Sequence, residues 1–548
     1  MTEHQPQTTE LPSRSILVLS FIGAFLFLYL RTFLLPATPF VAVTDQALFF
    51  ARAARIVHGQ VLYRDFFELV TPGTDLLYAA AFRLFGIHVW IMQAWAIALG
   101  LALSSVITWI ASRILRGPVI LLPALLFLVF DFNSGLDLTH HWYSTLAALG
   151  AVSILTGGAS LSRIFAAGSL CGIATLFTQT QGALTLIALA VYLLWLKRSE
   201  AQESSVLTQL ATLVLPFLLI LSCVLGYYLH KAGFRTIYFD LVVFPLKFLS
   251  SSEVNSPRTY LHQLPSVHAL ADIPGLVPYL FIYAVVPYIY LFGFHQLWRS
   301  RKTLPTALQQ RLVLLHLVGL ALFLAIVSGP RFFRLCTVAP PAILICTWLL
   351  SQQGSARRLA RNLLCVLAIA FALLLPIRRQ TQWHATLNLP IGRTAFSDIR
   401  VFREFQWLAQ RTHPSEPFFN NAALSLYLSL NNPTPSEFVN YDEFTRPEQV
   451  AAVIQSLQSD PPHFILLLPP TTNPSDVHDH AAPFRQYVYD NYHLAQTFYV
   501  DPDSRYEQEL WERGPKSDSQ VTPVPPETTS SQNQTRRSLS QLLQKHLS

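Results

Sequence analysis

About eleven apolar runs close to spanning length follow one another along the first two thirds of this chain, and they restrict its fold more than any other feature. They cover residues 15–35, 88–110, 119–131, 142–156, 164–177, 182–196, 206–229, 275–297, 312–327, 335–350 and 362–377. A bilayer-spanning helix needs about 20 mostly apolar residues. Only 13% of the 548 residues are charged, whereas soluble domains carry about 25%. These features predict an all-α polytopic membrane domain over residues 14–377.

Basic residues gather in short clusters between the apolar runs. The clusters are Arg113 with Arg116, Lys197 with Arg198, Arg299 to Lys302, and Arg357 to Arg361. Loops on the cytoplasmic face carry such an excess of Lys and Arg. The net charge of +7 therefore needs no nucleic-acid partner. If the N-terminus lies in the cytoplasm, successive spans alternate in direction and the basic clusters fall inside. The outer face then carries segments 36–87, 131–141, 179–181, 230–274 and 329–334, and everything after residue 378.

The composition becomes more polar after residue 378, too polar for further spans. Helical periodicity over 395–410 and 446–457, with strand-like runs at 416–420 and 462–468, predicts a small extracytoplasmic α/β domain over 378–513. The ends, residues 1–13 and 514–548, are polar or rich in Ser, Thr, Pro and Gln, and we expect them to be disordered.

The first outer segment carries an unusual set of carboxylates for a membrane boundary. Thr44 is placed to cap a helix over 45–58, with Asp45 in its first turn. The helix dipole favours a carboxylate there, so Asp45 has either a stabilising role or the role of a catalytic base facing a cavity. Asp65 and Glu68 follow in the same segment and are candidates for substrate binding.

The second outer segment, 131–142, is dense in side chains that bind ligands. Asp137, His140 and His141 could together hold a divalent metal ion, but their spacing matches no tight metal motif. Contact with a polar substrate is therefore the favoured role. Gln179 and Gln181, in the short turn between two apolar runs, either bind the same substrate or only close a helical hairpin.

Several cations lie on the face that the positive-inside rule leaves poor in Lys and Arg. Arg331 and Arg334 flank two phenylalanines at a membrane boundary, and Lys247 lies in the large outer segment. Arginine binds phosphate well because its planar fork contacts two oxygens. We expect these residues to bind an anionic ligand such as a lipid phosphate. The alternative is an ion pair with Asp240, Glu253 or a loop carboxylate.

Arg52, in the predicted helix after Asp45, is a further candidate for the lipid phosphate. Carboxylates, cations and amides on one face suit a reaction between a membrane-embedded, phosphate-linked donor and a polar acceptor. The cations would hold the phosphate, and a carboxylate would deprotonate or orient the acceptor hydroxyl.

The same segments resemble the GT-C superfamily of polytopic glycosyltransferases. The residues that carry the resemblance are Thr44-Asp45, Gly59, Leu62 to Phe67, Pro72-Gly73-Thr74, Phe82 to Gly86, Gly168 to Leu189, and Arg331 onward with Pro340-Pro341. Relatives include protein O-mannosyltransferases, lipid A aminoarabinose transferases and dolichyl-phosphate-mannose-type transferases. The resemblance implies juxtamembrane helices in the first outer loop, a functional carboxylate at Asp45 and a polyprenyl-phosphate sugar as donor. Gln46 stands where many members have a second acidic residue.

The sequence as a whole predicts a glycosyltransferase in the bacterial inner membrane. It would move a hexose or pentose from a polyprenyl phosphate to a lipid, glycan or protein. One competing hypothesis is a transporter or flippase of lipid-linked sugars, which predicts mid-span charges and broken helices in two matching halves. Another is a membrane scaffold whose outer domain binds a partner.

Overall fold

The computed structural model describes residues 14–199, 205–249, 255–258, 260, 273–419, 421–432, 434–436, 445–467, 480–499 and 507–514. The predicted disordered ends therefore lie outside the described residues, apart from Gly514. Glu253, Asn420 and Leu468, which enter predictions above, also lie outside them. The chain divides into two compact units. The first comprises residues up to 402 with 409–414 and 422–430, and the second comprises 403–408, 415–421 and the residues from 431 onward.

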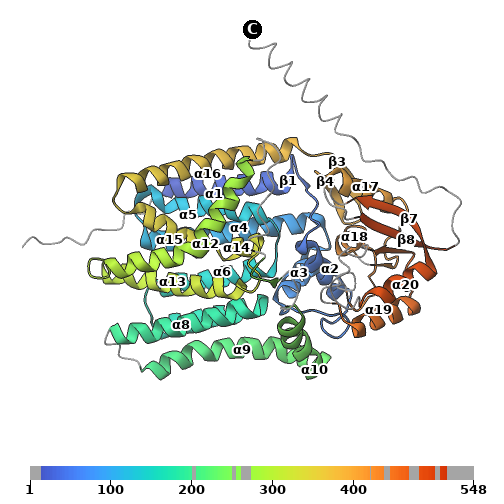
Figure 1. Cartoon of the computed structure of the whole chain (residues 1–548), viewed down its shortest axis with the longest axis horizontal. Helices are drawn as coiled ribbons and strands as arrows, with labels where there is room; N and C mark the ends of the chain where they lie inside the picture. Colours follow the sequence, from blue (N-terminus) through green and yellow to red (C-terminus); the bar gives the residue numbers. More distant parts are fainter. Residues whose placement is uncertain are drawn as a thin grey trace, which may run out of the picture. The chain divides into compact units, whose positions relative to one another are not determined.

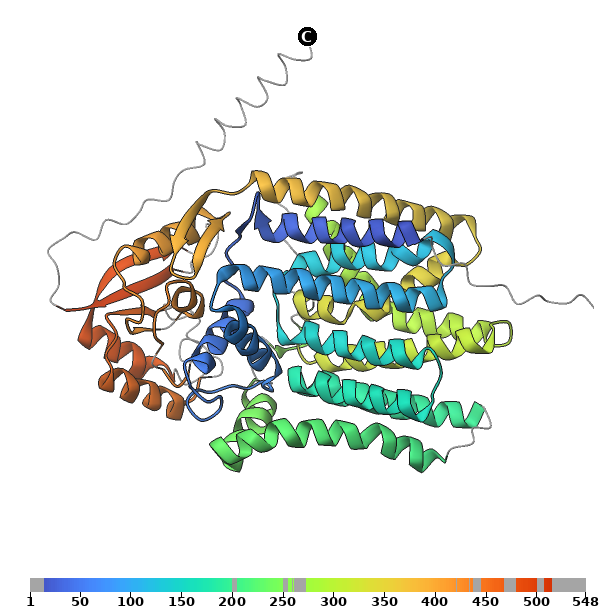
Figure 2. The same ribbon diagram turned by 180° about the vertical axis from the view of Figure 1, so that it is seen from behind.

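The first unit is a bundle of apolar helices that run side by side (Figures 1 and 2). Every predicted apolar run contains a helical segment, although the end of the first run, Phe33–Leu34, forms strand β1. The long helices are α1 (Arg14–Thr32), α4 (Val89–Ile114), α6 (His140–Leu155), α7 (Leu161–Phe177), α8 (Gln179–Ser199), α9 (Val206–Ala232), α12 (Ile273–Ser300), α13 (Thr306–Ile326), α15 (Pro340–Ser351) and α16 (Ser355–Thr381). Shorter turns are η1 (Gly117–Leu121), α5 (Leu122–Leu126), η2 (Phe127–Asp131), η3 (Phe132–Gly135), α10 (Phe234–Tyr238), η4 (Phe239–Val243), η5 (Pro245–Leu249) and α14 (Phe332–Val338).

Eight helical segments among the described residues are long and apolar enough to cross a membrane. Two shorter apolar segments, Gly117–Asp131 and Leu161–Phe177, accompany them. The multi-pass, all-α membrane architecture is therefore confirmed. The prediction of about eleven spans stays a prediction, because several of the eleven runs form helices shorter than a bilayer is thick.

Small residues allow α7 to pack closely against α9. A Cβ atom at Gly168 would overlap the carbonyl oxygen of Leu213, and one at Gly172 would lie 3.2 Å from the Phe217 Cα. The two glycines are four residues apart, which is the small-xxx-small spacing of membrane helix pairs. Because lipid tails are as apolar as the helix surfaces, close backbone packing provides much of the association energy within a bilayer.

Two short helices, α2 (Asp45–Val57) and α3 (Gly73–Phe85), lie beyond one end of the bundle, which we call the loop end (Figure 2). They follow a small hairpin, β1 (Phe33–Leu34) with β2 (Thr38–Pro39). The connection between α2 and α3 is fixed to the bundle, since Thr71 Oγ1 donates to the Thr175 carbonyl over 2.7 Å. The predicted juxtamembrane helices are therefore present.

The segment after α16 begins with strands rather than the predicted helix 395–410. Strands β3 (Ala385–Leu389) and β4 (Gly392–Phe396) form an antiparallel hairpin, and α17 starts only at Ile399 and ends at Ala409. The prediction was wrong at its start because Ala395 and Phe396 pair with the opposite strand, which helical periodicity in a single segment does not reveal. Helix α18 (Ala422–Tyr427) also belongs to the first unit.

The second unit contains a four-stranded sheet in the order β5-β6-β8-β7. Its elements are β5 (Phe418–Phe419), α19 (Pro447–Ser459), β6 (Phe464–Leu467), α20 (Ala482–Asn491), β7 (Tyr492–Tyr499) and β8 (Glu507–Arg513). A buried apolar cluster including Val453, Ile465 and Phe484 holds both helices against the sheet. The predicted α/β class of this region is therefore confirmed. The boundaries predicted at 378 and 513 stay predictions.

Candidate functional site

Asp45 is the first residue of α2, but the helix start is capped differently from the prediction. Thr44 occupies the N-cap position of α2, but its side chain makes no hydrogen bond to its own helix. Asp137, from the second loop, accepts hydrogen bonds from the Thr44 hydroxyl (2.8 Å) and the Gln46 backbone N–H (2.7 Å). The predicted cap position is confirmed, but the side chain that bonds the helix start is that of Asp137, because a carboxylate from a distant segment satisfies a free N–H group of α2 and complements its dipole.

Asp45 and Asp137 thus form a pair of carboxyl groups at one helix end. Burial, and after it the charge of Asp45, raise the pKa of Asp137 to about 7, although the hydrogen bonds that Asp137 accepts act to lower it. Asp45 is partly exposed to solvent. Desolvation by the surrounding protein atoms raises its pKa, whereas the charges of Arg52, Arg334 and Arg331 act to lower it. Two interacting carboxyl groups of raised pKa can hold or release a proton near neutral pH.

Three of the four predicted phosphate-binding cations act electrostatically on Asp45, and one of them already has a fixed partner. Arg52, 2% exposed, forms an ion pair with Glu68, 1% exposed. Glu68 also accepts a hydrogen bond from the Val70 backbone N–H over 2.9 Å. A buried, paired guanidinium of this kind orients the loop between α2 and α3, because separating the two charges would leave one of them buried alone.

Arg331 and Arg334 lie at the start of α14, and their charges reach Asp45. Arg334 donates to the Asn255 side-chain oxygen (2.6 Å) and to the Gly329 carbonyl (3.2 Å). Both partners are neutral, so these bonds hold the guanidinium in place and leave its charge for an anion.

The two histidines of α6 line the same region. His140 Nδ1 lies 2.9 Å from Thr178 Oγ1, and the rings of His140 and His141 are 3.9 Å apart. Their donor atoms do not converge with carboxylates on one point. Among the described residues, no group of three His, Cys, Asp or Glu side chains is arranged to hold a metal ion.

Three other predicted site residues, Gln179, Asp65 and Lys247, contact neighbouring groups of the loops. Gln179 Nε2 donates to the Leu69 carbonyl over 2.9 Å, which attaches the first loop to α8. Asp65 pairs with the adjacent Arg64 and accepts from the Val61 N–H, and these contacts lower its pKa. Lys247 lies on η5 with its ammonium 5.5 Å from the Phe248 ring centre. Its charge is not among those that act on Asp45.

Gln181 is fully buried, and within the described part of the chain its side-chain amide has no hydrogen bond. Burial of an unpaired amide costs free energy, so this residue remains available to a polar ligand.

A tyrosine pair that the sequence did not single out holds the Asp137 loop. The Tyr78 hydroxyl donates to the Leu138 carbonyl (2.9 Å) and lies 2.8 Å from the Tyr143 hydroxyl. The Tyr78 ring stacks on Phe50 of α2 with 3.9 Å between ring centres. Helical spacing places Tyr78 on the inner face of α3, but no local signal gives its partner, because the contacts come from distant segments.

No protein-family model and no curated protein matches the sequence. Solved structures do resemble it. ArnT from Cupriavidus metallidurans bound to undecaprenyl phosphate is 12% identical, with a TM-score of 0.54 over 92% of this chain and 99% of that chain. The apo state of the same protein gives a TM-score of 0.56 with the same identity and coverage. The archaeal oligosaccharyltransferase AglB from Archaeoglobus fulgidus, with an inhibitory peptide and a dolichol-phosphate, is 10% identical with a TM-score of 0.48. It covers 83% of this chain and 69% of that chain.

Proposed function

We propose that this chain, which has the GT-C fold of ArnT, is a membrane glycosyltransferase. Its donor would be a sugar linked to a polyprenyl phosphate, and its acceptor a lipid, glycan or protein. The observation that carries the proposal is the arrangement around Asp45. A carboxylate of raised pKa at the loop end lies within electrostatic reach of two arginines from a helix far away in the sequence.

Arg331 and Arg334 bind the donor phosphate in this proposal. Transfer breaks the bond between the anomeric carbon and a phosphate oxygen, so negative charge builds up on the departing lipid phosphate. Fixed guanidinium groups stabilise that charge without reorganising. Support comes from the hydrogen bonds of Arg334 to neutral partners, which fix its side chain and leave its charge for the phosphate.

Asp45 acts as the base. The acceptor oxygen attacks the anomeric carbon, a new carbon–oxygen bond forms, and the hydroxyl proton passes to the carboxylate. A base works best with a pKa near the operating pH, and crowding raises the pKa of Asp45. Asp137 positions Asp45 through its hydrogen bond to the start of α2, and the proton that the pair takes up is distributed over both carboxyl groups.

The acceptor and donor approach from the loop end, which we assign to the extracytoplasmic face. The basic clusters at the other ends of the helices support this orientation through the positive-inside rule. His140, His141 and Gln181 are the side chains proposed to contact the sugar or acceptor. This part of the proposal rests on the position of these residues beside Thr178 and Arg334.

The test is transfer of radiolabelled sugar from a polyprenyl phosphate by the protein reconstituted in lipid vesicles. Asp45→Asn should lower the rate at least 100-fold, because general-base catalysis contributes about 10²- to 10⁴-fold. Asp65→Asn is the matched control: it removes a carboxylate of the same loop that pairs with exposed Arg64, and it should retain transfer within about threefold. Undiminished transfer by Asp45→Asn would remove Asp45 from the mechanism.

A further inference from the structure

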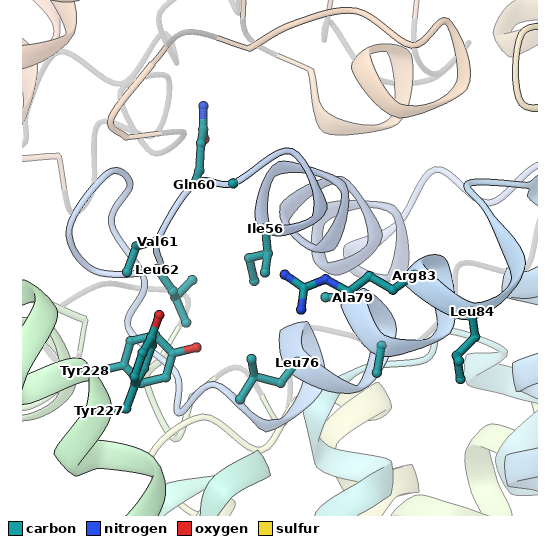
Figure 3. A pocket seen from close by; sticks show the side chains of 12 residues that line it. Ile56, Gln60, Val61, Leu62, Leu76, Ala79, Arg83, Leu84, Tyr227 and Tyr228 are labelled. Carbon is teal, nitrogen blue, oxygen red and sulfur yellow. The ribbon is translucent and has the colours of Figure 1, made fainter.

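A cavity of about 630 Å³ lies at the loop end between α3, the end of α2 and the end of α9. The residues that line it are Ile56, Gly59, Gln60, Val61, Leu62, Leu76, Ala79, Ala80, Arg83, Leu84, Tyr227 and Tyr228. Figure 3 shows the Arg83 side chain extending between Ile56 and Ala79, with the two tyrosines across the cavity. None of the residues proposed for sugar transfer lines this cavity.

The cavity lies on the opposite side of α3 from the Asp45 region. Asp75 and Tyr78 are buried on the inner face of the helix, and the Tyr78 hydroxyl reaches the Asp137 loop. Leu76, Ala80 and Arg83 follow at spacings of four and three residues on the outer face. The helix therefore separates two environments, and each has its own cations.

Arg83 is the charged group of this cavity. Within the part of the chain that the structure describes, its guanidinium has no ion pair or hydrogen bond. Two other guanidinium groups lie near the cavity: that of Arg55 donates to the Gln60 side-chain oxygen over 2.6 Å, and that of Arg64 pairs with Asp65. Among the residues that line the cavity, Arg83 is thus the one charged side chain, and the cavity has room for an anion beside it.

The surroundings of Arg83 are those of a membrane interface. Leu84 is 76% exposed and Phe85 is 56% exposed, so apolar side chains flank the arginine where lipid would cover them. Phe85 also lies against Trp90, with 6.0 Å between ring centres, and aromatic residues concentrate at the level of lipid headgroups. Tyr227 lies on the last turns of α9, at the same end of that apolar helix.

An interfacial arginine can also simply extend toward any headgroup. Two features favour a defined site. The side chain lines a formed cavity rather than open surface, and Tyr227 and Tyr228 add hydroxyl groups and ring faces opposite the guanidinium (Figure 3). An anionic headgroup with apolar chains fits this combination of one cation, two tyrosines and an apolar rim.

We propose that the Arg83 cavity binds the phosphate headgroup of an anionic phospholipid, with Arg83 as its counter-charge and the acyl chains along the apolar rim. The site is separate from the sugar-transfer site and does not depend on the proposed function.

Native mass spectrometry of the detergent-purified protein tests this proposal, with phosphatidylglycerol and phosphatidylcholine as probes. We expect the wild type to retain phosphatidylglycerol at about tenfold lower lipid concentration than phosphatidylcholine. Arg83→Gln should remove this preference, since a hydrogen bond to a charged group contributes enough for about a tenfold change. Arg235→Gln is the matched control, because Arg235 is exposed on α10 and does not line the cavity. It should bind as the wild type does.

Ala80→Phe distinguishes lipid binding in the cavity from unspecific electrostatic attraction of the lipid to the protein surface. It fills the cavity from an exposed helical position without changing charge, and we expect it to weaken phosphatidylglycerol binding as strongly as Arg83→Gln. Wild-type binding by Ala80→Phe, or equal retention of the two lipids by the wild type, would overturn the proposal. Complete displacement of the lipid by millimolar inorganic phosphate would reassign the cavity to free phosphate and also overturn it. Unchanged midpoints of thermal unfolding verify that the variants are folded.

Discussion

The two arginines on opposite sides of the α2–α3 helix pair differ in burial and in charge pairing. On one side Arg52 is 2% exposed and pairs with Glu68, which is equally buried. On the other side Arg83 is exposed, lines a cavity and has no charged partner among the described residues. Burying an unpaired charge costs much free energy, so a buried arginine needs a counter-charge within the fold. An arginine at the membrane interface stays solvated and can bind a counter-charge from a ligand. One arginine therefore shapes the site, and the other is available to bind.

The comparison is tested most severely by Arg52→Met. It leaves the Glu68 carboxylate buried and unpaired, and we expect a loss of about 3–5 kcal/mol in the free energy of unfolding. Denaturant titration of the detergent-solubilised protein measures this loss. The double variant Arg52→Met with Glu68→Leu removes both charges and should recover most of the stability. A single variant as stable as the wild type would show that the pair does not hold the loop.

The next largest effect concerns the attachment of α3 to the bundle. A Cβ atom at Gly73 would lie 2.5 Å from the Leu176 carbonyl oxygen, so Gly73→Ala must displace the start of α3. We expect a loss of about 1–3 kcal/mol, typical of overpacking, together with slower sugar transfer. Gly226→Ala is the matched control, because a Cβ atom there meets nothing within 4 Å. Equal stability of the two variants would contradict the close approach.

The pH dependence of sugar transfer tests whether Asp45 and Asp137 titrate as a coupled pair. Because the pKa of Asp137 is raised to about 7, the carboxyl pair takes up a proton as the pH falls through neutrality. Transfer should then fall on the acid side by up to about tenfold per pH unit. Asp137→Asn removes one negative charge, which lowers the pKa of Asp45. The acid limb of kcat/KM should therefore move to lower pH by about one unit, and an unmoved limb would show that the two groups titrate independently.

The smallest effect is expected on the other side of the helix pair. Arg83→Gln removes a charge without a fixed partner, so the free energy of unfolding should change by no more than about 0.5 kcal/mol. The midpoint of thermal unfolding measures this change. Measured beside Arg52→Met, this variant completes the comparison. A loss as large as that of Arg52→Met would mean that Arg83 stabilises the fold.

The sequence by itself determined the class of this protein. Long apolar runs predict helices because a bilayer requires the backbone to satisfy its own hydrogen bonds, and each predicted run contains a helix. Local chemistry also placed the start of α2 at Asp45, and the resemblance to GT-C enzymes implied the juxtamembrane helices of the first loop.

Only the tertiary structure decided which partners these residues have. The side chain of Asp137 rather than that of Thr44 bonds the start of α2, Arg52 pairs with Glu68, and Ala395 belongs to a strand although its segment has helical spacing. The Arg83 cavity, too, depends on α9 lying beside α3. Periodicity and composition describe one segment at a time, whereas capping, charge pairing and cavity formation depend on atoms that the chain brings together from distant positions.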